Sequence, residues 1–184
     1  VKNETGYKNL IFLSSLSYLN KSSDVGISLN DLQGKTDGLF CFVGGEFNPL
    51  LLLHNENKEI DIFINKLKKL FQNNLLFELQ RINDLVLDSF ESNLIIKSNK
   101  HNIPMIGTNN IKFGNDDEFS AHDALLCVAQ KTTINNGARK TSNNQLAFKN
   151  NQKMIDLFCD VPEIIENNYN VAISCSYYPK EVLP

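Results

Sequence analysis

Three side chains in this sequence could act as metal ligands or as general bases: Glu46, His122 and Asp123. Glu46 follows an apolar run that ends at Val43, and a carboxylate in such a place can coordinate a hard cation. His122 and Asp123 are neighbours in a segment with helical spacing, where an imidazole can serve as a ligand or a general base. The structural alternative for this pair is that both side chains fix their helix to the rim of the fold.

Other catalytic motifs are missing from the sequence. Gly44-Gly45 follows a predicted strand but lacks the remaining glycines and the lysine of a phosphate-binding loop. No Gly-x-Ser-x-Gly nucleophile elbow occurs. The four cysteines are widely separated and form no Cys-x-x-Cys pair, so we expect reduced, partly buried thiols rather than disulfides or zinc ligands. They are Cys41, Cys127, Cys159 and Cys175.

The elements that must position these residues follow from the spacing of apolar side chains. Apolar runs predict strands at 38–43, 75–80 and 103–108, the first of them buried on both faces. Helical spacing at 56–71 and 84–100 separates these strands, and that alternation predicts the α/β class with a parallel sheet. Further helices are expected at 5–20, 116–131 and 150–159. The last helix is expected to begin with Asp160 as its N-cap and to bury Ile165, Tyr169, Ala172 and Ile173.

Length and charge narrow the class of protein. A chain of 184 residues and 20.8 kDa fits a single domain, over 1–184, with 42% hydrophobic residues to form a core. The net charge of −3 disfavours a domain that grips nucleic acid by itself. No apolar run is long enough to span a membrane, and the polar opening residues resemble no secretory signal, so we expect a cytoplasmic protein. Val1 in place of an initiating Met leads us to expect a longer parent chain.

Several strings, in fixed order along the chain, resemble segments of the bacterial DNA polymerase III alpha-subunit family. They are Glu4-Thr-Gly-Tyr-Lys-Asn-Leu10, Asp37-Gly-Leu39 with Gly44-Gly-Glu46, Phe77-Glu-Leu-Gln-Arg81, Thr108-Asn-Asn110, Ala121-His-Asp-Ala-Leu-Leu-Cys127, and Met154-Ile-Asp-Leu-Phe-Cys-Asp160 with Pro162-Glu163 and Asn167. The resemblance covers nearly the whole chain, and several motifs in order are more specific than any one alone.

This resemblance implies a PHP (polymerase and histidinol phosphatase) domain, a distorted β/α barrel of TIM-like type. The part present would lack the first strands of the barrel, and residues 116–184 would form a mainly helical part that leads toward the polymerase palm. Where metal-binding members of the family carry ligands, this chain has Ile82, Asn83, Asn110 and Lys112. A degenerate metal site is therefore implied, with no catalytic residue and no cofactor in this part, and with magnesium needed only by the parent polymerase.

The function implied by the resemblance is that of a scaffold within the catalytic alpha subunit of the replicative DNA polymerase. Its expected partners are the remaining domains of that subunit and the proofreading exonuclease subunit, with DNA reached only through the full enzyme and no membrane contact. An exposed sheet edge also predicts either self-association of the fragment or partial disorder. The alternative is a residual metal-dependent phosphoesterase or pyrophosphatase that uses Glu46 and His122.

Overall fold

The computed structural model describes residues 1–19, 26–46, 48–55 and 59–180. Within these ranges the strands are β1 (Cys41–Gly44), β2 (Leu75–Gln80) and β3 (Met105–Thr108). The helices are α1 (Glu4–Leu19), α2 (Pro49–Asn55), α3 (Ile60–Phe71), α4 (Leu85–His101), α5 (Phe119–Ala129), α6 (Asn151–Leu157) and α7 (Glu163–Ser174). Three short 3-10 turns are η1 (Gln72–Asn74), η2 (Asp116–Glu118) and η3 (Asn144–Leu146).

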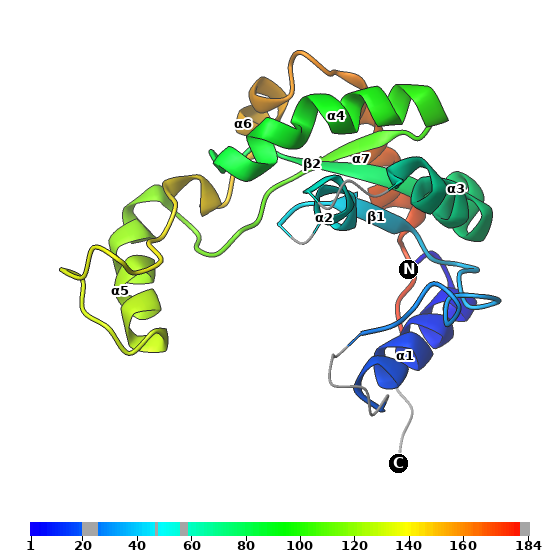
Figure 1. Ribbon diagram of the computed structural model, residues 1–184, viewed down its shortest axis with the longest axis horizontal. Helices are drawn as coiled ribbons and strands as arrows, with labels where there is room; N and C mark the ends of the chain where they lie inside the picture. The colour runs from blue at the N-terminus through cyan, green and yellow to red at the C-terminus, as the bar shows by residue number, and fades with distance from the viewer. Residues whose placement is uncertain (20–25, 47, 56–58, 181–184) are drawn as a thin grey trace.

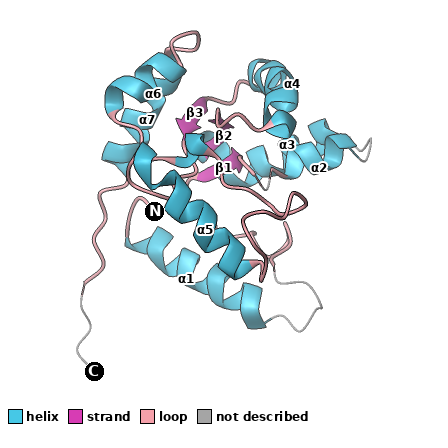
Figure 2. Ribbon diagram, turned by 90° about the vertical axis from the view of Figure 1, so that its left-hand side faces the viewer, coloured by secondary structure: helices cyan, strands magenta, loops and turns pink. Residues whose placement is uncertain are grey.

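The three strands form one parallel sheet in the order β1-β2-β3, which confirms the predicted α/β class. Val43 pairs with Phe77, and Phe77 pairs in turn with Met105. The described residues form an open sheet rather than a closed barrel. Figure 2 shows α2, α3 and α4 on one side of the sheet and α6 and α7 on the other, so the central strand β2 lies in the core.

Local signals account for the two helices that connect the strands. In α3, apolar residues recur at helical spacing and turn one face into the core, as predicted; the buried ones are Ile60, Ile64, Leu67 and Phe71. The Asp84 carboxylate accepts hydrogen bonds from the N–H groups of Val86 (2.9 Å) and Leu87 (3.1 Å), which caps α4. Asn102, with φ of 49°, ends α4 in the left-handed conformation.

Amide side chains of helix α7 form hydrogen bonds with the outer edge of β3. The Gly107 N–H donates to Asn168 Oδ1 at 3.1 Å, and Asn168 Nδ2 donates to the Gly107 carbonyl at 2.8 Å. Asn167 Nδ2 donates to the Met105 carbonyl at 2.8 Å. A side chain at position 107 would lie 2.5 Å from the Phe158 ring and 2.7 Å from Ile164, so only glycine permits this close approach.

Three expectations from the sequence are wrong, and helix α2, at the apolar run 49–53, was not among the predicted elements. Strand β1 is not buried on both faces, because Phe42 is 43% exposed; among the described residues it is also an edge strand. The Asp160 carboxylate does not cap α7, because it pairs with Arg81 instead. Ile164 is the fully buried residue of α7, whereas the predicted inner residues Tyr169, Ala172 and Ile173 are exposed and Ile165 is half-buried.

The remaining predicted helices agree with the structure except near their ends. The segment predicted as a helix at 116–131 is η2 followed by α5, and α6 has Asn150 as its N-cap. Residue 20 of the first predicted helix and residues 56–58 of the second lie outside the described residues. In the described part of the chain, no helix combines the length and the apolar character needed to cross a membrane.

Candidate functional site

A cleft of about 740 Å³ lies beyond the carboxyl ends of the three strands, where parallel sheets usually place their functional groups. It contains six of the seven positions singled out from the sequence. They are Glu46, Ile82, Asn83, Asn110, Lys112 and His122. The other wall comes from α5 and from the loop after it, through residues such as Lys140, Ser142 and Asn143.

Glu46, just after β1, is the carboxylate that the sequence placed at this edge. Its Oε1 lies 3.3 Å from Lys140 Nζ, and its Oε2 accepts a hydrogen bond of 3.4 Å from Asn110 Nδ2. Glu46 therefore faces an ammonium group and an amide within the cleft. Both side chains of the ion pair are more than one third exposed, so it stabilises the fold by less than about 1 kcal/mol.

His122 is half-buried and holds the loop that closes the cleft. Its Nδ1 lies 2.6 Å from Ser142 Oγ, and its ring centroid lies 5.3 Å from that of Phe113. These contacts match the structural alternative considered for this residue, because the imidazole joins α5 to two other segments. One ring nitrogen is thereby already engaged within the protein.

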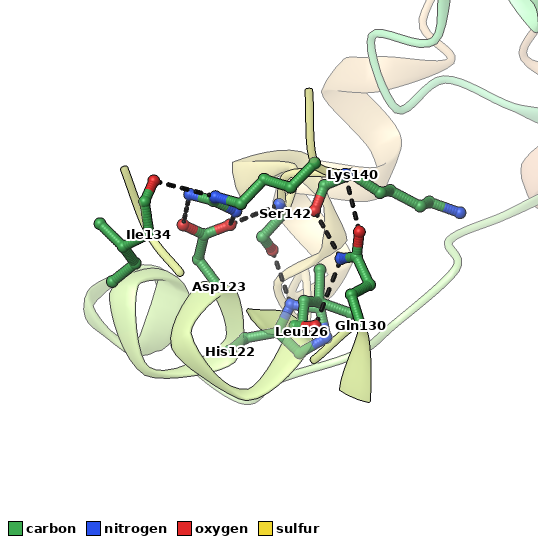
Figure 3. Close-up of polar contacts among 8 residues, drawn as sticks. His122, Asp123, Leu126, Gln130, Ile134, Lys140 and Ser142 are labelled. Carbon is green, nitrogen blue, oxygen red and sulfur yellow. Dashed lines mark hydrogen bonds and ion pairs between the residues drawn. The ribbon is translucent and has the colours of Figure 1, made fainter. Parts of the chain in front are cut away.

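Asp123 does not line the cleft and instead organises the loop over residues 130–142. Its carboxylate accepts a bidentate pair from the Arg139 guanidinium, at 2.8 and 2.6 Å, and the Ser142 N–H at 2.8 Å (Figure 3). The Arg139 ion pair, helped by the Ser142 N–H, lowers the pKa of Asp123 to about 2. Arg139 also donates to the Ile134 carbonyl at 3.1 Å, so it ties α5 to two points of the loop.

The four positions at which the family resemblance implies lost ligands do not form a cation site. Ile82 is buried, and its carbonyl accepts a hydrogen bond from Asn143 Nδ2. Asn83 is exposed with φ of 55°, a left-handed conformation that asparagine adopts more readily than most residues. Asn110 is directed to Glu46, and Lys112 brings a positive charge to the wall.

These side chains do not fit a divalent metal ion. A hydrocarbon and an ammonium group cannot coordinate a cation, and the one carboxylate at the end of β1 is paired with Lys140. Over the described ranges no three His, Cys, Asp or Glu side chains come together in a way that could hold a metal. All four cysteines are free thiols, and burial raises the pKa of Cys41 to about 11.

Several residues that line the cleft were not indicated by the sequence. Lys140, Ser142 and Asn143 lie in a polar loop with no motif, and each reaches the site by contacts across the fold. No local pattern could have placed them there. Glu46 and Asn110 could be located because each follows a strand of one parallel sheet. That reasoning gives no information about a loop that folds back later in the chain.

Arg81, the residue after β2, connects the end of this strand to other segments of the fold. Its guanidinium contacts Glu91 at 2.5 Å and Asp160 at 2.6 Å, and it donates to the Leu157 carbonyl at 2.7 Å. It also lies over the ring of Phe158, 5.2 Å from the centroid. One side chain thus joins the end of β2 to α4 and to the segment between α6 and α7.

Comparison with known proteins shows which proteins are similar to this chain over nearly its whole length. No family model matches it. It is 34% identical over 182 residues to DNA polymerase III subunit alpha of Rickettsia bellii, a match over 96% of this chain and 15% of that protein. The protein of the same name from Borreliella burgdorferi is 32% identical over 198 residues, which is 100% of this chain and 17% of that protein.

A third relative matches nearly the same length of chain at lower identity. The DNA polymerase III subunit alpha of Caulobacter vibrioides is 27% identical over 180 residues, covering 96% of this chain and 16% of that protein. The chain therefore spans about one sixth of the length of these relatives. These matches confirm the family resemblance inferred from the sequence: along nearly its whole length, the chain is homologous to one segment of bacterial DNA polymerase III alpha subunits.

Proposed function

We propose that this chain is a non-catalytic part of the alpha subunit of a bacterial replicative DNA polymerase. It would be a degenerate PHP domain that supports the polymerase core and offers a docking surface to the proofreading exonuclease subunit. Homology over 96–100% of the chain supports the parent protein. The observation that carries the scaffold role is the composition of the cleft, where Ile82, Asn110 and Lys112 stand at positions that the resemblance assigns to ligands.

Nucleotidyl transfer belongs to another part of the parent subunit in this proposal. Two-metal chemistry needs convergent carboxylates, and the cleft offers Glu46 paired with Lys140 and Asp84 committed to capping α4. Magnesium therefore serves the parent polymerase and not this cleft. The proposed β/α barrel would be completed by strands that pair with the free edge of β1, in the same subunit.

Metal binding by the intact polypeptide tests the scaffold role. After equilibration with zinc or manganese and removal of free ions, this region should retain no stoichiometric metal. The readout is the metal content of the full-length protein and of a Glu46→Ala, His122→Ala variant. Metal that is retained by the unmutated protein and lost in the variant would contradict the proposal. An equal metal content in the two proteins would mean that the metal is bound elsewhere.

A residual phosphoesterase remains the second candidate, because Glu46 and His122 do line the same cleft. It predicts metal-dependent release of phosphate from pyrophosphate or a nucleotide, abolished by Glu46→Ala. The proposed scaffold role predicts no such release from either form.

Copurification of the exonuclease subunit with the intact protein, and its loss on deletion of this region, tests the docking role separately.

A further inference from the structure

Helix α5 carries apolar side chains on every side. Of its eleven residues only Ser120, His122 and Asp123 are polar, and the Asp123 carboxylate is paired with Arg139. The inner side contains Phe119, Leu126 and the buried Cys127. A helix that is apolar all round is normally covered on all sides in the assembled protein.

The outer stripe of α5 consists of four exposed residues at helical spacing, Ala121, Ala124, Leu125 and Val128. Leu125 is 64% exposed and Val128 is 73% exposed. Figure 1 shows α5 at one end of the long axis of the molecule, set apart from the sheet and from α1. Within the described residues, nothing covers this stripe.

The charges at the two ends of α5 indicate how a partner helix would lie. Asp116, Asp117 and Glu118 precede the helix, and Lys131 follows it, all of them exposed. Helices favour acidic residues in their first turn and basic residues in their last. A partner that ran antiparallel would bring its acidic start to Lys131 and its basic end to Asp117 and Glu118, whereas Asp116 is already paired with Lys153 at 3.1 Å.

The small surface area of the stripe favours a partner segment in the same polypeptide over a separate molecule. A helix of eleven residues is about 16 Å long, so one stripe buries only a few hundred Å². A stable complex between separate molecules needs roughly 800 Å² from each partner. A tethered segment needs much less, because its effective concentration reaches the millimolar range. A parent chain as long as the relatives would contain many further segments, since this chain spans only 15–17% of their length.

We propose that the outer stripe of α5 docks an antiparallel amphipathic helix of the same polypeptide, from outside residues 1–184. This inference rests on the proposed function, because it requires the longer parent chain. The small alanines, Ala121 and Ala124, permit close approach of the two helices, and Leu125 and Val128 supply most of the apolar surface.

Cysteine accessibility in the full-length polypeptide tests this docking. Val128→Cys places a thiol on the stripe, and Ser120→Cys places a matched thiol on the same helix off the stripe, where it is also exposed. Maleimide labelling, followed at each peptide by mass spectrometry, should be about tenfold slower at 128 than at 120 under native conditions. Leu125→Cys serves as a second reporter, and all three should react equally in urea.

Three outcomes would overturn the docking proposal, and they are distinguishable. Equal native rates at 120, 125 and 128 in a long polypeptide would mean that the stripe is uncovered, with the proposed function left intact. Protection that disappears on dilution of the protein would assign the stripe to a second molecule. A native polypeptide of only 184 residues, read as an intact mass in the same experiment, would remove both the docking segment and the proposed function.

Discussion

At the scale of single residues, Arg81 shows how much of the fold depends on contacts that no local pattern reveals. The Phe77-Glu-Leu-Gln-Arg81 string indicated a strand, and β2 ends at the predicted residue. The sequence did not show that the Arg81 guanidinium would bind Glu91 and Asp160, ten and 79 positions away. The same contact explains why Asp160 failed as the predicted cap of α7, because the carboxylate is committed to a stronger, charged partner.

Replacing Arg81 should destabilise the protein through the groups that it leaves without partners. Arg81→Ala removes the donors to Glu91 and to the Leu157 carbonyl, and we expect a loss of about 2–3 kcal/mol in the free energy of unfolding. Arg81→Lys should recover only part of it, because an ammonium cannot span both carboxylates. Urea unfolding measures the change. The control is Lys8→Ala, which removes an exposed pair with Glu4 and should leave the free energy of unfolding almost unchanged; equal losses in the two variants would contradict this account.

Asp123 should make the loop after α5 sensitive to acid. Its pKa is lowered to about 2 by Arg139, below the value of about 3.9 in an unfolded chain. A depressed pKa stabilises the fold above the unfolded value, and that contribution is lost as the pH falls from about 4 toward 2. The urea midpoint of the parent should fall in this window more steeply than that of Asp123→Asn. Parallel pH profiles for the two proteins would show that this ion pair does not contribute.

At the scale of elements, the sequence predicts best where one face of a segment is buried by regular spacing. Helices α3 and α4 followed from such spacing. The apolar run at 49–53 has no alternation, so its spacing could not distinguish a core segment from helix α2. In α7 the buried side was misjudged, because this helix packs on a sheet edge through the amides of Asn167 and Asn168. Amide contacts of this kind leave no hydrophobic pattern.

The β3 edge of the sheet should therefore be sensitive to mutation of the amide side chains of α7. Asn168→Ala leaves the Gly107 N–H and carbonyl without partners, and we expect a loss of about 1–3 kcal/mol with faster hydrogen exchange of the Gly107 amide. Asn170→Ala, an exposed change on the same helix, is the matched control and should leave both quantities unchanged. If exchange at Gly107 is the same in both variants, α7 does not protect this edge.

At the scale of the whole molecule, the α/β class and the parallel sheet were predictable, and so was the edge of the sheet at which the candidate residues meet. The cleft could not be predicted in full, because six of its fifteen lining residues come from the segment at 140–146, which Asp123, His122 and Glu46 hold by contacts across the fold. The free edge of β1 and the outer stripe of α5 show that the described chain leaves surfaces uncovered that a larger assembly would bury.

The size of the native polypeptide tests the central claim most directly. An antibody raised against this chain should detect, in a lysate of the source cells separated under denaturing conditions, a band several-fold heavier than 20.8 kDa. Peptides from that band should include both this segment and further sequence related to DNA polymerase III alpha subunits. A single band near 20.8 kDa would contradict the account, because the chain would then be an independent protein rather than a part of the polymerase.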